Sequence, residues 1–283
     1  MRKCALKCDS PVFTDKNERK RNTDMAIIKI LAVGDVVGQD AVAYLDGALE
    51  NIKRALGADF TVVNAENAAT GNGLDTQSAR ALLAAGADVL TTGNHVYRHS
   101  GLHSFLEESS RIVRPLNFPA ECPGNGYTVY STGAARILVM NVQGVTYMEP
   151  LACPFEAVER VLNREKGSFD VAILDIHAEA TSEKAAVARH FDGRISAVFG
   201  THTHVQTADA RILPKGTGFI TDIGMCGPED SILGVESGVI IDRLRLHMPK
   251  RFDVAKGRIS ATGALFAVDT VSGKTVSVEG ISF

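Results

Sequence analysis

Several signatures of other protein classes are missing from this chain of 283 residues. No apolar run approaches the roughly 18 residues of a membrane-spanning helix. The formal net charge of −3 gives no general attraction to nucleic acid or anionic membranes. The glycine-containing segment 34–38 lacks the G-x-G-x-x-G spacing of dinucleotide-binding folds, and no P-loop motif occurs. We therefore expect neither a membrane partner nor a nucleic-acid partner, while a small nucleotide stays open as a substrate.

Cysteine is scarce as well. The cysteines are odd in number and contain no C-x-x-C pair, so neither a disulfide framework nor a structural zinc site is indicated. We expect reduced thiols and a cytoplasmic protein. The five cysteines are Cys4, Cys8, Cys122, Cys153 and Cys226.

Residues 1–24 differ from the rest of the chain. They hold seven basic and four acidic side chains and lack the apolar region of a secretory signal. Because Met25 directly precedes a strand-like run, we interpret 1–24 as a disordered extension or as the product of a start codon placed too early. A basic arm that binds nucleic acid is the alternative interpretation.

From residue 26 onward, strand-like and helix-like segments alternate without a repeat or a linker. This pattern predicts one α/β domain over 26–283 with a two-sheet core. Two apolar runs flank a Gly turn and predict a hairpin. The last 40 residues predict antiparallel strands at the end of the chain. The expected strands are 27–33, 60–63, 89–92, 127–130, 136–142, 171–176 and 197–199, and the expected helices are 40–56, 76–85, 154–164 and 182–190.

Polar side chains follow five of these strands at their carboxyl ends, the edge at which open α/β sheets bind ligands. Each residue alone has an ordinary structural interpretation. Asp35 suits a helix N-cap or a turn, and a lone His177 suits a hydrogen-bonded core histidine. The coincidence of five indicates a site, and His202-x-His204 suits an extended loop that holds metal. The segments are Gly34-Asp35, Glu66-Asn67, Asn94-His95, His177 and His202-Thr203-His204.

The residue types of this set define its chemistry. Carboxylates, amides and imidazoles without a thiolate suit two ions such as iron, manganese or zinc. Two ions roughly 3.5–4 Å apart clamp the attacking and leaving oxygens of a phosphoryl displacement and acidify water to hydroxide. We expect Glu66 to bridge the ions and His95 to act as general acid. The expected ligands are Asp35, Glu66, Asn67, Asn94, His177, His202 and His204.

The remaining histidines lack neighbours of this kind. His99, His103, His190 and His247 fall in helical or amphipathic segments, so we expect them at the surface or hydrogen-bonded in the core. His99 stays open because it is close to His95 in the sequence.

The segments that carry this set resemble the calcineurin-like metallophosphoesterases, and more closely their YmdB-like branch. The resemblance covers nearly all of 26–283, and its most specific stretches are 175–184 and 200–207. It implies a four-layer αββα sandwich of two mixed sheets flanked by helices. Val37 stands where the ordinary family pattern has a histidine, and Glu66 where it has an aspartate. Asn67 takes the place of the missing histidine in this interpretation.

The resemblance also implies an activity, the opening of 2′,3′-cyclic nucleotides such as 2′,3′-cAMP. Iron is the first expectation for the metal, with manganese or zinc as alternatives. No residue identified so far reads the base, and self-association is left open. The implied ligand sets are Asp35, Glu66, Asn67 and His204 for one ion, and Glu66, Asn94, His177 and His202 for the other.

Two other functions are compatible with parts of this pattern. A regulatory or RNA-associated protein could keep the fold and work through partners, although low basic charge counts against direct nucleic-acid binding. An amidohydrolase also uses a His-x-His pair, but there the pair usually ends the first strand, whereas here it lies past residue 200.

Overall fold

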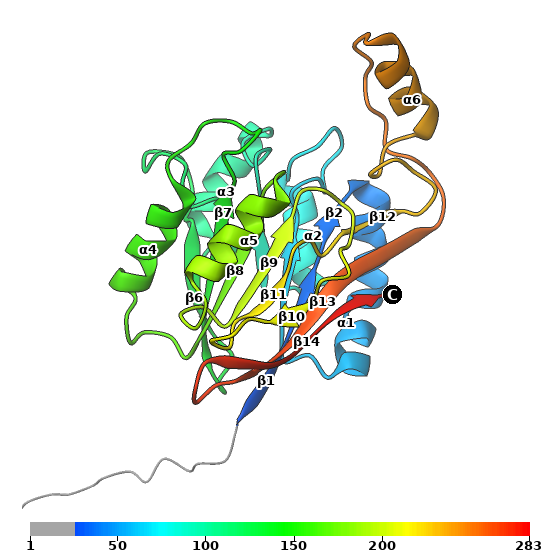
Figure 1. The fold of residues 1–283 in the computed structure, drawn as a ribbon. Helices are drawn as coiled ribbons and strands as arrows, with labels where there is room; N and C mark the ends of the chain where they lie inside the picture. The colour runs from blue at the N-terminus through cyan, green and yellow to red at the C-terminus, as the bar shows by residue number, and fades with distance from the viewer. Residues whose placement is uncertain (1–25) are drawn as a thin grey trace, which may run out of the picture.

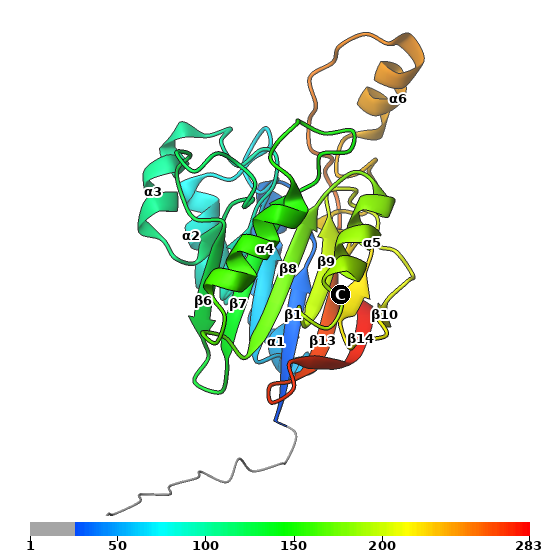
Figure 2. The ribbon, with the colours of Figure 1, turned by 60° about the vertical axis from the view of Figure 1, so that its left-hand side comes forward.

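The computed structural model describes residues 26–283, so the expectation for 1–24 lies outside the described part. Two β-sheets pack face to face, and helices cover both outer faces (Figures 1 and 2). The arrangement confirms the expected four-layer αββα sandwich of two mixed sheets. None of the helices in this part of the chain combines the length and the apolar character that crossing a bilayer requires.

The first sheet has eight strands in the order β2-β12-β13-β1-β3-β4-β5, with β14 paired to β13. β1, β3, β4 and β5 are mutually parallel, and β13 lies antiparallel to β1. The strands are β1 (Ile27–Val33), β2 (Asp35–Val36), β3 (Phe60–Asn64), β4 (Val89–Thr91), β5 (Ile112–Val113), β12 (Met225–Pro228), β13 (Ile259–Asp269) and β14 (Lys274–Ser282).

The second sheet has six strands in the order β10-β11-β9-β8-β7-β6. Its centre is parallel, and the hairpin of β6 and β7 closes one side, as predicted. The strands are β6 (Tyr127–Ser131), β7 (Arg136–Gln143), β8 (Val171–His177), β9 (Ala197–Thr201), β10 (Arg211–Ile212) and β11 (Gly218–Ile220).

Alternating side chains along the strands produce the layers. In β1, Leu31 and Val33 pack toward helices, whereas Ile30 faces the second sheet. In β7, Val139 faces the first sheet and Leu138 packs toward helices on the other side. Because these strands are buried on both faces, they appear in the sequence as nearly continuous apolar runs.

Helices α1 to α3 cover the first sheet, and α4 and α5 cover the second. A short helical turn, η1, precedes α3. The ranges are α1 (Gly38–Leu56), α2 (Thr76–Ala84), η1 (Ser100–Leu102), α3 (His103–Glu108), α4 (Pro154–Arg164), α5 (Thr181–His190) and α6 (Ser237–Leu246).

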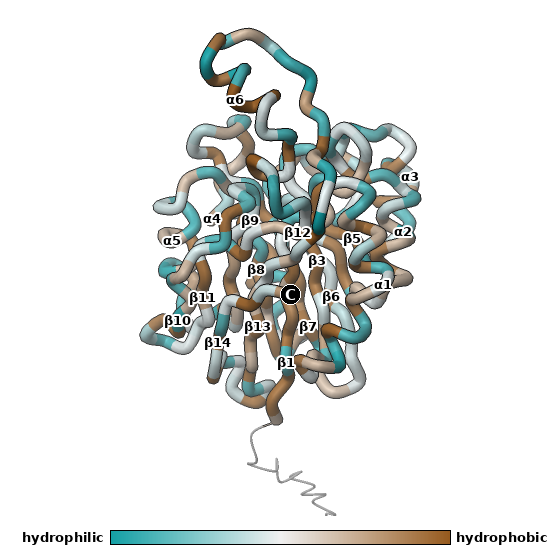
Figure 3. The backbone as a smooth tube through the Cα atoms, turned by 90° about the vertical axis from the view of Figure 1, so that its right-hand side faces the viewer, coloured by the Kyte–Doolittle hydropathy of each residue, from teal (hydrophilic) through white to brown (hydrophobic). Residues whose placement is uncertain are grey.

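The predicted strands and helices are confirmed to within a few residues, with two differences that concern the site. Asp35 lies in a separate short strand, β2, that pairs with β12, rather than in the turn after the first strand. Helix α6 was not predicted, and it buries none of its residues. It projects beyond the two sheets, with apolar positions that appear brown in Figure 3 (Figures 1 and 3).

Candidate metal centre

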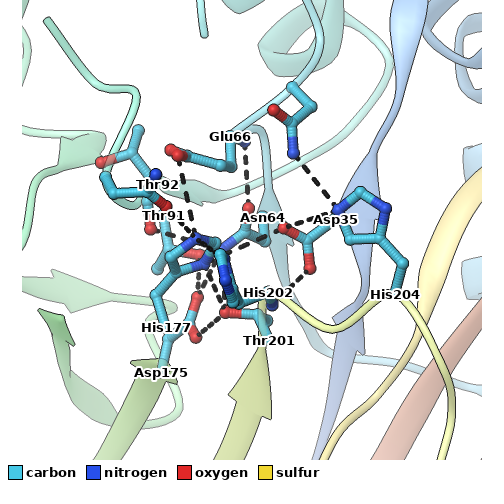
Figure 4. A network of polar contacts seen from close by, with 12 residues as sticks. Asp35, Asn64, Glu66, Thr91, Thr92, Asp175, His177, Thr201, His202 and His204 are labelled. Atoms are coloured by element: carbon cyan, nitrogen blue, oxygen red, sulfur yellow. Dashed lines mark hydrogen bonds and ion pairs between the residues drawn. The ribbon is translucent and has the colours of Figure 1, made fainter. Parts of the chain in front are cut away.

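The structure brings all eight predicted site residues to one edge of the sandwich. Figure 4 labels five of them, Asp35, Glu66, His177, His202 and His204. Strands β2, β3 and β4 of the first sheet and β8 and β9 of the second end at this edge. The sequence had suggested the edge of an open sheet, and the structure shows that two sheets contribute. The residues are Asp35 in β2, Glu66 and Asn67 after β3, Asn94 and His95 after β4, His177 at the end of β8, and His202 and His204 after β9.

The two carboxylates of the set are fully buried, and each has one oxygen without a partner. Asp35 Oδ2 accepts a hydrogen bond from the backbone N–H of His202 at 3.0 Å, while its Oδ1 has none. Glu66 Oε1 accepts from the backbone N–H of His95 at 2.5 Å, while its Oε2 has none. Burial raises the pKa of both carboxyls, that of Asp35 to about 6. Buried oxygens without partners are rare and suit a cation.

The three imidazoles of the set share one arrangement: one ring nitrogen faces an oxygen acceptor. His177 Nδ1 lies 2.9 Å from Thr201 Oγ1, and His204 Nδ1 lies 2.9 Å from Leu233 O. His202 Nε2 lies 3.2 Å from a Glu179 carboxylate oxygen. An N–H donated to each acceptor leaves the lone pair on the other nitrogen, which is how metal-binding histidines are commonly oriented.

The free nitrogens of these rings point toward the other predicted ligands. His177 Nε2 lies 3.0 Å from Asn94 Oδ1, 3.2 Å from His202 Nδ1 and 3.8 Å from Glu66 Oε1. Burial lowers the pKa of His177 and that of His202, which favours the neutral rings that bind metals.

A second group of donors surrounds His204. Its Nε2 lies 3.7 Å from Asp35 Oδ1 and 3.3 Å from Asn67 Nδ2. The Asn67 amide directs its oxygen toward His95 Nδ1 instead, at 3.1 Å. Ligation through the amide oxygen of Asn67 therefore requires a rotation of this side chain.

Within residues 26–283, no three His, Cys, Asp or Glu side chains are arranged so that they could hold an ion as they stand. The donor chemistry, the unpartnered carboxylate oxygens and the inward nitrogens nevertheless fit transition metals. The ligand roles accordingly stay predictions, which require side-chain rotations.

His95 sits beside this group with a side chain that is 22% exposed. Its Nδ1 lies 3.2 Å from Glu66 Oε1 as well as close to the Asn67 oxygen, so it faces two acceptors. An N–H on Nδ1 could donate to either of these acceptors.

Two cavities open at this edge and share His95 and His202. The larger has a volume of about 790 Å³ and also reaches Asn67 and His204. The smaller has a volume of about 410 Å³ and is bordered by Asn94. The predicted ligands thus line spaces that a small molecule can enter.

The loop after β9 adopts a strained backbone. His202 and His204 have φ values of 94° and 63°, a region that non-glycine residues rarely occupy. The intervening Thr203 donates its N–H and its hydroxyl to the buried carboxylate of Asp222, at 3.3 and 2.8 Å. Lys184 Nζ lies 2.7 Å from the same carboxylate. This pair of buried charges holds the loop against its strain.

Sequence reasoning missed a supporting network behind His177. Asp175 accepts hydrogen bonds from Thr201 at 2.7 Å, Asn64 at 2.9 Å and Thr91 at 2.5 Å. The pKa of Asp175 is raised to about 7, and burial is the largest cause of this rise. A carboxylate inside an otherwise apolar buried strand was the available signal, because such a group requires partners.

Gly93, which directly precedes the candidate ligand Asn94, has a steric role. A Cβ at this position would overlap the ring of His177. The absence of a side chain therefore allows β4 and β8 to bring Asn94 and His177 together.

The other histidines take no part in the site. His99 Nε2 contacts the Asn72 carbonyl at 2.9 Å, which answers the question the sequence left open. His103 packs on Tyr97, and His190 lies between Phe155 and Phe191. The fourth, His247, follows α6.

The two packed sheets with flanking helices define a sandwich of the metallophosphoesterase type. A solved phosphatase from Mycoplasma pneumoniae superposes with a TM-score of 0.86 at 34% identity, covering 92% of this chain and 94% of that one. A Staphylococcus aureus protein described as a 5′-nucleotidase shares the fold alone, at 14% identity and a TM-score of 0.54 over 90% of this chain and 54% of that one.

Sequence comparison narrows this class to one family. The family described as YmdB-like protein matches residues 31–281. A Bacillus subtilis (strain 168) protein named 2′,3′-cyclic-nucleotide 2′-phosphodiesterase is 41% identical over 254 residues, which span 90% of this chain and 96% of the relative. The chain belongs to the YmdB-like family.

Proposed function

We propose that the chain is a metal-dependent phosphodiesterase that hydrolyses 2′,3′-cyclic nucleotides. Its family and its relatives make it a phosphoric diester hydrolase. The metals, the nucleotide and the proton donor are the parts that we propose. The observation that carries them is the orientation of three imidazoles, each with one nitrogen held by an oxygen acceptor and the other turned inward.

The proposed ligands divide into two groups that share Glu66. When bound, two transition-metal ions, iron first among them, would neutralise phosphate charge and lower the pKa of a water molecule. Buried strands and second hydrogen-bond partners orient the three imidazoles toward these positions, and Asn67 would rotate to present its amide oxygen. The groups are Asp35, Glu66, Asn67 and His204, and Glu66, Asn94, His177 and His202.

Hydrolysis of the cyclic diester forms one P–O bond with water and breaks the P–O2′ bond, as the name of the Bacillus subtilis relative suggests. The water loses one proton and O2′ gains one. His95 supplies the latter from Nε2, while Nδ1 keeps its proton against Glu66 and Asn67.

The direct test is a substrate panel with two variants. The purified chain with added manganese should convert 2′,3′-cAMP to 3′-AMP faster than it hydrolyses 3′,5′-cAMP, as measured by chromatography. Glu66→Gln should lose both turnover and metal. His95→Ala should keep its metal and lose about 10²–10⁴-fold in turnover. A fully active Glu66→Gln protein would show that the assignment is wrong.

The expected setting is the cytoplasm with a small-molecule diester as partner. The described cysteines Cys122, Cys153 and Cys226 are free thiols, which suits a reducing compartment. A regulatory role through partners stays an alternative. Glu66→Gln that still rescues a deletion phenotype in cells would favour it.

A further inference from the structure

The segment 229–258, which we term the arm, contains α6 and leaves the body at the edge where the site lies (Figures 1 and 2). The arm is joined to the site by a hydrogen bond, because Leu233 O accepts from His204 Nδ1 at 2.9 Å. The left-handed backbone of Leu233, with φ of 56°, turns the chain at this contact.

The arm forms one wall of the larger cavity. The arm contributes the apolar side chains of Leu233, Val235, Phe252 and Val254 and the charged residues Arg251, Asp253 and Lys256, and the segment 70–72 also borders the cavity. The cavity, of about 790 Å³, lies in the range of roughly 300–1,000 Å³ that is typical of small-molecule sites. Apolar side chains beside the cationic Arg251 and Lys256 suit a ligand with a flat organic part and an anionic part.

Phe252 is the aromatic side chain of this wall, and a cation contacts its ring. The Arg243 guanidinium lies over the ring at 4.6 Å from its centroid. Arg243 does not line the cavity, whereas Phe252 does. The guanidinium thus contacts the Phe252 ring without itself bordering the cavity.

The smaller cavity offers a competing aromatic side chain, Tyr147. Tyr147 is 89% exposed, and its backbone has φ of 63°. No cation is stacked on this ring among the described residues. A ring fixed on one side stacks a ligand at a lower entropic cost than a ring that must first be ordered. The larger cavity and Phe252 are thus the better base site.

We propose that Phe252 is the platform on which the nucleobase of the substrate stacks, with the arm as the wall of the nucleoside subsite. This inference rests on the proposed function, and it assigns the base recognition that the metal-binding set lacks. Base–aromatic stacking tolerates any base, so Phe252 should favour nucleosides over substrates without a base and discriminate little among bases.

The test compares 2′,3′-cAMP with glycerol 1,2-cyclic phosphate, which has the same five-membered cyclic diester and no base. Phe252→Ala should lower the ratio of kcat/KM between the two substrates roughly tenfold, through KM for the nucleotide. Phe252→Tyr should keep the ratio. Leu244→Ala is the matched control on the arm, because Leu244 is 67% exposed and does not line the cavity.

Calorimetry separates this inference from the proposed function. The unmodified chain should bind 3′-AMP more tightly than inorganic phosphate, and Phe252→Ala should remove most of the difference. If neither cyclic diester is hydrolysed, the proposed function is wrong. The binding of 3′-AMP still tests whether Phe252 contacts the base, because it does not depend on turnover. The inference would be overturned if Phe252→Ala lost no affinity for 3′-AMP, or lost equal affinity for 3′-AMP and phosphate. It would also be overturned if the unmodified chain did not bind 3′-AMP, or if Tyr147→Ala had a larger effect than Phe252→Ala.

Discussion

At the scale of single residues, the hydroxyl of Thr201 connects a candidate ligand to the core. It donates to Asp175 Oδ1 at 2.7 Å and faces His177 Nδ1 at 2.9 Å. Because the hydroxyl proton goes to the carboxylate, the imidazole must donate its Nδ1–H. One hydroxyl therefore sets the tautomer that leaves Nε2 open toward Asn94 and Glu66.

Replacing this hydroxyl should have two measurable effects. Thr201→Val keeps the shape but leaves the Nδ1–H of His177 and an oxygen of Asp175 without their partner, which should cost about 1–3 kcal/mol in urea unfolding. Metal affinity should fall about 10–100-fold, as measured by titration with manganese. Thr201→Ser keeps the hydroxyl and serves as the control. Equal stability of the valine and serine variants would contradict this role.

At the scale of elements, helix α5 is linked to the loop after β9 by Lys184, which pairs with Asp222. The ammonium and the carboxylate of Asp222 are both fully buried, and Asp222 also accepts from the Thr203 and Gly224 N–H groups. A helix of one layer thereby fixes a loop that carries two candidate ligands.

Removing one partner of this buried pair should be costly. Lys184→Met leaves Asp222 uncompensated and should lower the free energy of unfolding by about 3–5 kcal/mol. Arg194→Met breaks the exposed pair with Glu159, whose side chains are 42% and 38% exposed, and should cost less than about 1 kcal/mol. Denaturant titrations of both variants measure the difference. Similar small losses would mean that the buried pair does not hold the loop.

The sequence predicted the elements whose burial pattern is local. Continuous apolar runs marked β1, β7 and β8, because strands covered on both faces need apolar side chains at every position. The short strands β2 and β11 were missed because their existence depends on partners far along the chain. Helix α6 was missed for another reason: it buries no face, so no apolar periodicity marks it.

The sequence predicted those site residues that lie at the ends of strands. All eight residues around the proposed ions lie at or after strand ends and have side chains that can bind metals, so their position and type were sufficient to predict them. Asp222 and Leu233 could not be found in this way. Their roles depend on the path of the chain after β9 and on contacts with a backbone carbonyl, which no residue type reveals.

At the scale of the whole molecule, the face-to-face packing of the two sheets creates the site. Neither sheet carries all the candidate ligands, because Asp35, Glu66 and Asn94 come from one and His177 and His202 from the other. The buried core between the sheets fixes their separation, and it thereby fixes the distances among these donors. The arm then adds a wall that neither sheet supplies.

The central claim is that these donors hold a pair of cations, and metal content tests it most directly. Protein purified without added metal should carry close to two transition-metal ions per chain by elemental mass spectrometry. A chain that contains no bound iron, manganese or zinc, and takes up none on dialysis against these ions, would contradict the account.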